Sequence, residues 1–230
     1  IFQNNLAKAH HTSTRHQRNL MVWASGHQDL AFPTTRIEDG CLRSRGLGAT
    51  LTPPLSLVAD RLGIYYDPRA PSQLEQMIAD TVTLRPDQKA RAERLRQQVI
   101  RAGLTKYNAG QTAAENTGTR RILVPGQVED DASILTAAGD IKTNLALLTA
   151  VRRANPDAII LYKPHPDVEA GLRLGAVPDR DAAASADRVL TNTDPGTLLT
   201  QIDEVWTMTS LLGFEALLRR STGRNSRQGD

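Results

Sequence analysis

Short apolar runs alternate with segments of helical periodicity throughout the second half of the chain. The apolar runs predict strands at 122–124, 158–162, 188–190 and 204–208. The periodic segments predict helices at 141–154, 197–202 and 211–219. This order of strands and helices indicates parallel strands joined by right-handed crossovers, which is typical of an α/β fold.

The first half of the chain has a less regular pattern. It predicts a strand at 20–24, a helix at 53–62, a strand at 64–66 and a charged helix at 85–101. Between the last two, Ser72 and Glu75 have the spacing of a capping box, which predicts a helix that starts after Ser72. Residues 1–20 are polar, and we expect a disordered or frayed terminus there.

A polar stretch at 105–120, poor in large apolar residues, separates the two patterns. Domain boundaries fall in segments of this kind, so we expect one α/β domain at 1–115 and a second at 116–220. The polar residues 221–230 are predicted to form a disordered tail.

Composition and charge narrow the classes of function. The net charge of +3, with a pI of about 9.2, suits anionic small substrates or a membrane surface and is too mild to indicate nucleic-acid binding. No apolar run approaches the roughly 18 residues that span a bilayer, so we expect a soluble or membrane-peripheral protein. The single cysteine, Cys41, excludes a disulfide framework and fits a reducing compartment.

Polar clusters lie at or directly after the carboxyl ends of three of the predicted strands of the second half. They are Gln127, Glu129, Asp130, Asp131 and Ser133; Lys163, His165, Pro166 and Asp167; and Thr207, Thr209 and Ser210. Ligands of open α/β sheets bind at the carboxyl ends of the strands, so these clusters predict a site that suits a phosphorylated sugar donor. Structural explanations remain open for each cluster: a solvated turn, a rigid proline loop, and a helix N-cap.

A second candidate site lies in the first half, where Glu38-Asp39-Gly40 places two carboxylates on a predicted turn. Arg43 and Arg45 follow in a glycine-rich loop, which could cradle a carboxylate or a phosphate. The alternative is that the two acids simply pair with the neighbouring arginines. The His10-His11 pair has no further ligand at metal-binding spacing, and we expect no metal site.

Several motifs, in this order, resemble the capsular polysaccharide synthesis and export family. They are RIEDGCLRSRGLGATLTPPLSLVADRLGIYYDPRAPSQLE from Arg36, KYN at 106–108, ILVPGQVEDDASI from Ile122, YKPHPD at 162–167 and VWTMTSLLGFEALLR at 205–219. Members of this family include the retaining β-Kdo transferases, which build the Kdo linker between Gram-negative capsule polysaccharide and lipid. The resemblance covers the chain from about Val22 to Arg219.

The resemblance implies a GT-B-like fold of two Rossmann-like domains with parallel sheets, an acceptor-side N-terminal domain and a nucleotide-sugar-binding C-terminal domain. It implies CMP-Kdo as the donor, no cofactor and no metal. The family's Q-x-x-x-D-x-S element matches Gln127, Asp131 and Ser133, which makes Asp131 the implied nucleophile of a double displacement with net retention. Glu38 is the implied facing acid/base or acceptor-binding acid.

The remaining site residues also come from the resemblance. The implied donor-binding residues are Lys163, His165, Pro166, Ser133, Thr209, Ser210 and Glu215. The implied residues for the sugar carboxylate or the acceptor are Asp39, Arg43 and Arg45. The implied partners are CMP-Kdo, a lipid-linked Kdo acceptor and capsule-export proteins, at the inner face of the inner membrane of the cell or in the cytoplasm.

Two alternatives to an active transferase follow from the same sequence. The family's usual N-terminal strand and the segment after residue 219 have no counterpart here, so the C-terminal part is expected to be incomplete. A truncated module could bind nucleotide, or support the capsule-export machinery, without turnover. The third hypothesis is another GT-B enzyme, such as a sugar-nucleotide epimerase.

Overall fold

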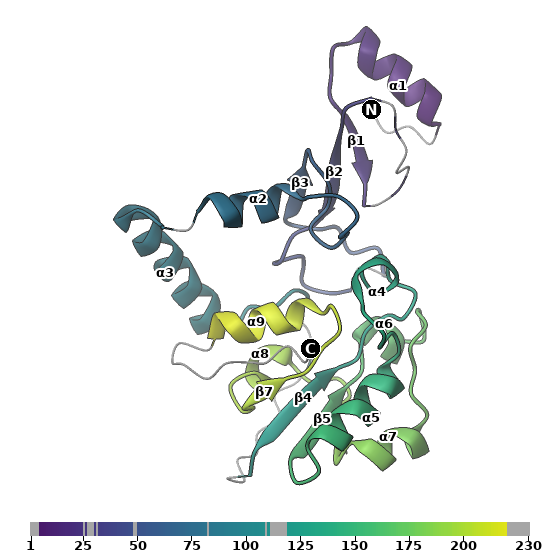
Figure 1. Cartoon of the computed structure of the whole chain (residues 1–230), viewed down its shortest axis with the longest axis vertical. Coiled ribbons are helices and arrows are strands. Elements are labelled where there is room, and N and C mark those ends of the chain that lie inside the picture. Colours follow the sequence, from purple (N-terminus) through teal and green to yellow (C-terminus); the bar gives the residue numbers. More distant parts are fainter. Residues whose placement is uncertain are drawn as a thin grey trace.

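The computed structural model describes residues 5–24, 26, 30, 32–47, 50–81, 83–108, 110 and 119–219. Two β-sheets lie toward opposite ends of the molecule, and α4 and α9 lie between them (Figure 1). The elements of the N-terminal part are α1 (Leu6–Arg15), β1 (Leu20–Trp23), β2 (Thr34–Asp39), β3 (Leu57–Asp60), α2 (Gln73–Asp80) and α3 (Pro86–Arg101).

The C-terminal part is the larger α/β unit. Its elements are β4 (Arg121–Pro125), α4 (Ala132–Ala137), α5 (Asn144–Ala154), β5 (Ile159–Lys163), α6 (Pro166–Glu169), α7 (Asp179–Ser185), β6 (Arg188–Val189), α8 (Pro195–Leu198), β7 (Glu204–Val205) and α9 (Leu211–Arg219). All four strands are parallel, in the order β6-β5-β4-β7. The predicted α/β class is therefore confirmed, together with all four predicted strands of this half.

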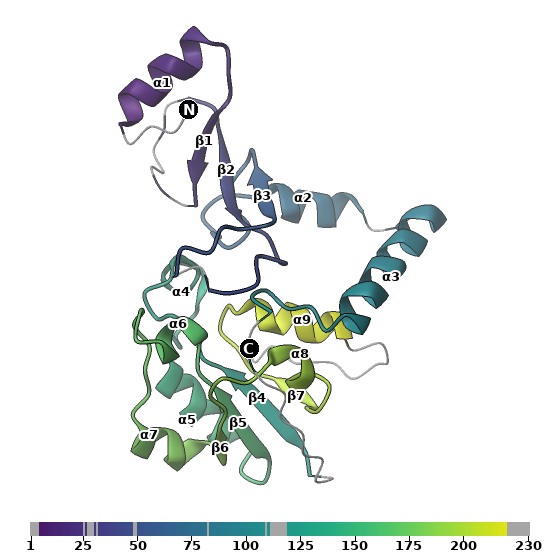
Figure 2. The ribbon, with the colours of Figure 1, turned by 180° about the vertical axis from the view of Figure 1, so that it is seen from behind.

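Helices cover both faces of the parallel sheet, as Figure 2 shows from behind. Because successive strand residues point to opposite faces, Ile122 and Val124 pack against α5 and α7, whereas Leu123 packs with residues of α8 and α9. Every residue of β4 is buried. A continuous apolar run is typical of a central strand that is covered on both faces. The carboxyl end of β4 lies toward the middle of the molecule (Figure 1).

The N-terminal sheet has three strands in the order β1-β2-β3. β1 and β2 are parallel, but β3 is antiparallel to β2. The helix predicted at 53–62 is therefore wrong, since its second half is β3. The side chain of Asp60 explains why the chain turns at this point: it accepts hydrogen bonds from the backbone N–H groups of Leu62, Gly63 and Gln73.

Other predictions for the N-terminal part had mixed outcomes. The capping box at Ser72 and the long helix α3 are confirmed. The strand predicted at 64–66 is wrong, because these residues lie in a turn in which Ile64 is buried. The frayed terminus is also wrong for residues 6–15, which form α1 with Asn5 as its side-chain cap. The tail predicted at 221–230 lies outside the described residues.

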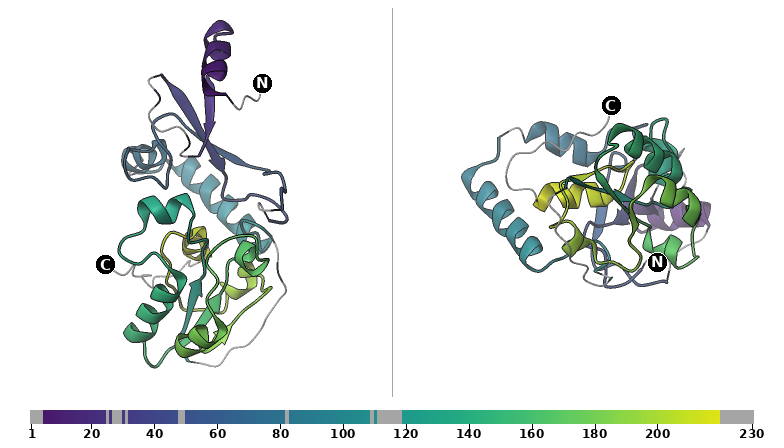
Figure 3. Two further views of the ribbon diagram at one scale, coloured as in Figure 1. Left: turned by 90° about the vertical axis from the view of Figure 1, so that its right-hand side faces the viewer. Right: turned by 90° about the horizontal axis from the view of Figure 1, so that it is seen from below.

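Two connections join the parts. The C-terminal end of α3 packs against α9, and the Arg96 side chain donates to the Leu218 carbonyl over 2.8 Å. Figure 3 shows α3 running beside the larger unit in two further views. In the second connection, the segment that follows α3 passes between the Arg43–Gly46 loop and α9.

Candidate active site

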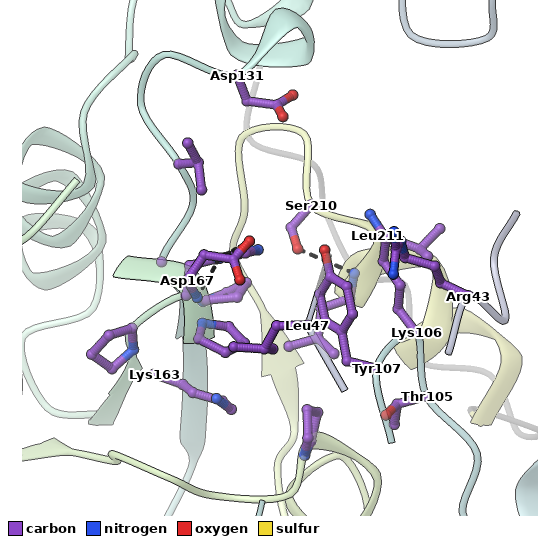
Figure 4. A pocket seen from close by; sticks show the side chains of 18 of the residues that line it. Arg43, Leu47, Thr105, Lys106, Tyr107, Asp131, Lys163, Asp167, Ser210 and Leu211 are labelled. Atoms are coloured by element: carbon purple, nitrogen blue, oxygen red, sulfur yellow. Dashed lines mark hydrogen bonds and ion pairs between the residues drawn. The ribbon is translucent and has the colours of Figure 1, made fainter. Parts of the chain in front are cut away.

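A cavity of about 720 Å³ lies between the two parts and is lined by both (Figure 4). Its walls come from the end of β2 and the following loop, from residues 105–107, from the carboxyl ends of β4 and β5, and from the start of α9. This volume falls in the range of small-molecule sites. The edge of the parallel sheet on which the sequence predicted a ligand site therefore faces a cavity.

Most of the predicted site residues line this cavity. They are Glu38, Asp39, Arg43, Asp131, Ser133, Lys163, His165, Pro166, Thr209, Ser210 and Glu215. The structure does not bring Arg45 together with them, because Arg45 is exposed and does not line the cavity. The neighbouring Arg43 and Ser44, by contrast, are buried and hydrogen-bonded, Arg43 to the Ser44 hydroxyl and Ser44 to the Gly46 carbonyl.

Asp131 is the N-cap of α4, a short helix that the sequence did not predict. Its Oδ1 atom accepts hydrogen bonds from the backbone N–H of Ser133 over 2.9 Å and from the Ser133 hydroxyl over 2.7 Å. Among the described residues, no hydrogen bond or ion pair to Oδ2 is found. The loop thus fixes the carboxylate through one oxygen and leaves the other available in the cavity (Figure 4).

Gln127, which the matched motif implied as a catalytic residue together with Asp131, does not line the cavity. Its Nε2 donates to the Thr209 hydroxyl over 2.8 Å, and its Oε1 accepts from the Thr207 hydroxyl and the Thr209 N–H, each over 3.0 Å. The Thr209 hydroxyl also lies 3.0 Å from that of Ser133. Gln127 therefore ties the Asp131 loop to the start of α9.

The two acids of the N-terminal part end a strand, and are not on the turn predicted for them. The pKa of Glu38 is raised, mainly by burial, and the charges of Asp39 and Asp131 raise it further. The carboxylates of Glu38 and Asp131, which both line the cavity, therefore interact electrostatically. Asp39 forms an ion pair with Arg43, whose guanidinium also donates to the Thr52 carbonyl. The alternative in which acid and arginine pair is therefore realised for Asp39, within the cavity wall.

His165 is held as a neutral imidazole. Its Nδ1 accepts the backbone N–H of Asp167 over 3.2 Å, which assigns the proton to Nε2. Burial and the charges of Lys106 and Lys163 lower the pKa of His165 to about 4. The side chain can therefore donate a neutral hydrogen bond at pH 7. Lys163 is buried beside it, with its Nζ 3.8 Å from the Glu169 carboxylate.

Glu215 is a buried carboxyl group in α9. Its Oε1 accepts the Lys106 N–H over 2.8 Å, and its buried Oε2 has no hydrogen-bond partner in the described part of the chain. Burial raises the pKa of Glu215 to about 7, although the charges of Arg219 and Lys106 oppose this. The group is therefore poised to change its charge near neutral pH.

A pH dependence of stability follows from Glu215. Because its pKa is higher in the folded state than the ordinary value of 4.5, its contribution is complete below pH 4.5 and is lost as the pH rises to about 7. Replacement by Gln keeps an acceptor for the Lys106 N–H but cannot ionise. We expect Glu215→Gln to reduce the fall in unfolding free energy between pH 5 and pH 8 by roughly 2–3 kcal/mol.

The measurement is urea denaturation of the wild type and Glu215→Gln at both pH values, with Glu169→Gln as the control. Glu169 also lines the cavity, but its carboxylate lies 3.8 Å from the Lys163 ammonium, whereas the Oε2 atom of Glu215 has no hydrogen-bond partner in the described part of the chain. An unchanged pH dependence in Glu215→Gln would show that other groups cause the loss of stability.

Lys106 and Tyr107 also line the cavity, together with Asp167 of the predicted polar cluster. Lys106 and Tyr107 lie in the KYN motif that carried the resemblance, but the sequence assigned neither of them a role in the site. The ring of Tyr107 packs edge-on against His165, with centroids 6.0 Å apart. No group of three His, Cys, Asp or Glu side chains suited to a metal ion occurs within the described ranges.

Comparison with known proteins agrees with these features. The chain matches the family described as "Capsule polysaccharide biosynthesis protein" over residues 10–108 and 102–222. The chain belongs to this capsule polysaccharide family. It is 44% identical over 209 residues to the capsule polysaccharide modification protein LipA of Neisseria meningitidis serogroup B, covering 87% of this chain and 30% of LipA.

The chain is also similar to the lipopolysaccharide-processing protein LpsZ of Rhizobium meliloti. It is 44% identical over 195 residues, which cover 83% of this chain and 44% of LpsZ. The chain thus spans less than half the length of either curated relative.

Two solved structures from Thermosulfurimonas dismutans share the fold. The KpsC β-Kdo 2,7 transferase matches with a TM-score of 0.73 and 33% identity, covering 94% of this chain and 67% of that chain. The KpsC β-Kdo 2,4 transferase matches with a TM-score of 0.77 and 27% identity, covering 95% and 76%. The fold is therefore GT-B-like, as the resemblance implied. Within the described ranges, no helix is both long and apolar enough to cross a membrane.

Proposed function

We propose that this chain is a glycosyltransferase module that transfers Kdo from CMP-Kdo during capsule polysaccharide biosynthesis, with retention of configuration. The observation that carries the proposal is Asp131, whose carboxylate is fixed through Oδ1 and available through Oδ2 in a cavity that also holds Glu38. The similarity to two β-Kdo transferases supports Kdo as the transferred sugar.

In the proposed first step, Oδ2 of Asp131 attacks the anomeric carbon of Kdo. The bond from that carbon to the phosphate oxygen breaks, and CMP leaves with the electron pair. The two hydrogen bonds from Ser133 to Oδ1 hold the carboxylate in one orientation, so little reorganisation accompanies the attack. The product is a glycosyl ester of Asp131 with inverted configuration.

In the second step, a hydroxyl of the acceptor attacks the same carbon and the ester bond to Asp131 breaks. A second inversion restores the original configuration. Glu38 is the proposed base for the acceptor proton. Burial raises its pKa, which makes it a stronger base than an exposed glutamate. The proposed acceptor is a lipid-linked Kdo, which places the protein at the membrane surface with capsule-export proteins as partners.

The leaving CMP needs a site for its phosphate. Lys163 and His165, with its Nε2–H, line the cavity at and directly after the carboxyl end of β5, and Thr209 and Ser210 line it directly before the first residue of α9. A cation, a neutral donor and a helix N-terminus are groups that stabilise a phosphate without a metal. Glu215 is the proposed acceptor for a ribose hydroxyl.

The test is to incubate the chain with CMP-Kdo and a Kdo-primed lipid mimic and to follow CMP release and the glycosylated product. We expect both, with the β configuration of the new linkage established by NMR. Binding of CMP without release or transfer would contradict the proposal and favour a non-catalytic nucleotide-binding module. Stronger binding of a UDP-sugar than of CMP would favour another GT-B enzyme.

A further inference from the structure

Lys106 occupies the connection between the two parts of the molecule. Its backbone carbonyl accepts hydrogen bonds from the N–H groups of Arg43, over 3.0 Å, and Ser44, over 3.1 Å. Its own N–H donates to Glu215 in α9 over 2.8 Å. Hydrogen bonds from both parts therefore fix the backbone of Lys106, and none of them involves its side chain.

The side chain of Lys106 lines the cavity, where the other cations have carboxylate partners. Arg43 pairs with Asp39, Lys163 lies 3.8 Å from Glu169, and Arg173 lies 3.0 Å from Asp130. In the described part of the chain Lys106 forms no ion pair, and its Nζ lies 5.2 Å from the ring centroid of Tyr107. A half-buried ammonium without a counter-ion suits an anionic ligand.

The positive charge of Lys106 acts on titratable groups from several elements that line the cavity. It lowers the pKa values of Glu38 at the end of β2, Asp167 in α6 and Glu215 in α9, and also that of His165. Burial disfavours the charged form of Lys106 itself, but Tyr107, Asp39 and Asp131 outweigh this and raise its pKa. The ammonium is therefore charged at neutral pH, in the space that a donor would enter.

We propose that Lys106 is a donor-binding residue whose ammonium group binds an anionic oxygen of the sugar nucleotide. This inference rests on the proposed function. A donor of the proposed class carries two such groups, the phosphate of CMP and the carboxylate of Kdo. Lys106 lies in the segment between the Arg43–Ser44 loop of the N-terminal part and α9 of the C-terminal part. From this position its ammonium group can bind either the phosphate or the carboxylate.

The experiment compares the wild type with Lys106→Met and Lys106→Arg. Calorimetry gives the dissociation constants of CMP and of cytidine, and CMP release from CMP-Kdo gives KM and kcat. If Lys106 binds the phosphate, Lys106→Met weakens CMP binding by about 10- to 100-fold and leaves cytidine binding unchanged. If it binds the carboxylate, CMP binding is unchanged and KM for CMP-Kdo rises by a similar factor.

Either of these two results supports the inference, together with recovery of most of the affinity in Lys106→Arg. The matched control is Lys142→Met, since Lys142 is exposed and lies outside the cavity wall. Wild-type values for both CMP and CMP-Kdo in Lys106→Met would overturn the inference. So would an equal loss of cytidine binding, which would indicate a structural role.

The two proposals can fail separately. A wild type that binds CMP but never releases it from CMP-Kdo contradicts the transferase, while the comparison of CMP with cytidine still tests Lys106. A wild type that turns over, with a Lys106→Met variant that matches it, contradicts only the role of Lys106. Thermal unfolding of each variant tests whether the substitution has changed the stability of the fold.

Discussion

Replacement of Asp131 by Asn is expected to lower CMP release and Kdo transfer by on the order of 10³-fold or more, the scale of losses seen when a catalytic nucleophile is removed. Asn has nearly the shape of Asp, and its Oδ1 can still accept both hydrogen bonds from Ser133. The loop should therefore keep its conformation. The amide that replaces Oδ2 is a poor nucleophile, so the glycosyl ester cannot form.

The neighbouring Asp130 provides the matched control. It is half exposed and pairs with Arg173 over 3.0 Å, and it does not line the cavity. Asp130→Asn removes the same charge one residue away, and we expect at most a small loss of activity. Mass spectrometry of the wild type after brief exposure to CMP-Kdo should detect one Kdo residue on the peptide that contains Asp131. Activity in Asp131→Asn within a few-fold of the wild type would exclude this residue as the nucleophile.

The parts of the fold that could be predicted from the sequence depend on local signals. The helix α9 begins and ends at the predicted residues, because the Ser210 hydroxyl accepts the Leu212 N–H and the apolar residues that follow have helical spacing. The central strand β4 was recognisable because its burial on both faces requires a continuous apolar run. The capping box at Ser72 likewise satisfies the first N–H groups of α2 within four residues of sequence.

The errors occurred where a distant partner decides the conformation. Residues 57–60 form a strand because they pair with β2. The sequence of the segment alone does not indicate this pairing. The short helix α4 depends on the Asp131 cap, and the acids of that loop indicated a site more clearly than they indicated a helix. Strand pairing at this distance depends on tertiary contacts, and these override local propensity.

The candidate site shows the same division. The carboxyl ends of the parallel strands could be identified from the chain, so Lys163, His165 and Asp131 were expected at one edge. The role of Gln127 in positioning the Thr207–Thr209 loop depends on hydrogen bonds that span about 80 residues of sequence, such as the one to Thr209. The place of Lys106 depends on both parts of the molecule together, which explains why its motif alone gave no role.

The largest expected effect on stability concerns Asn144, a buried side chain at the start of α5. Its Oδ1 accepts the Gln127 N–H, and its Nδ2 donates to the Gln127 and Gly175 carbonyls, each over 2.8 Å. These bonds fix the polypeptide directly after β4, from which the Asp131 loop begins. Asn144→Ala leaves three buried backbone groups without partners, and each such group costs about 1–3 kcal/mol.

We therefore expect Asn144→Ala to lower the free energy of unfolding by roughly 3–5 kcal/mol, measured by urea denaturation monitored by circular dichroism. Asn155→Ala is the matched control, because Asn155 is also buried, follows the other end of α5, and donates from its side chain only to the Val151 carbonyl in the described structure. A single lost bond there should cost about 1 kcal/mol. Similar losses of unfolding free energy in the two variants would show that the three hydrogen bonds of Asn144 do not add up to a larger effect. The conformation of the loop that carries Asp131 would then depend on Gln127 and Ser133 instead.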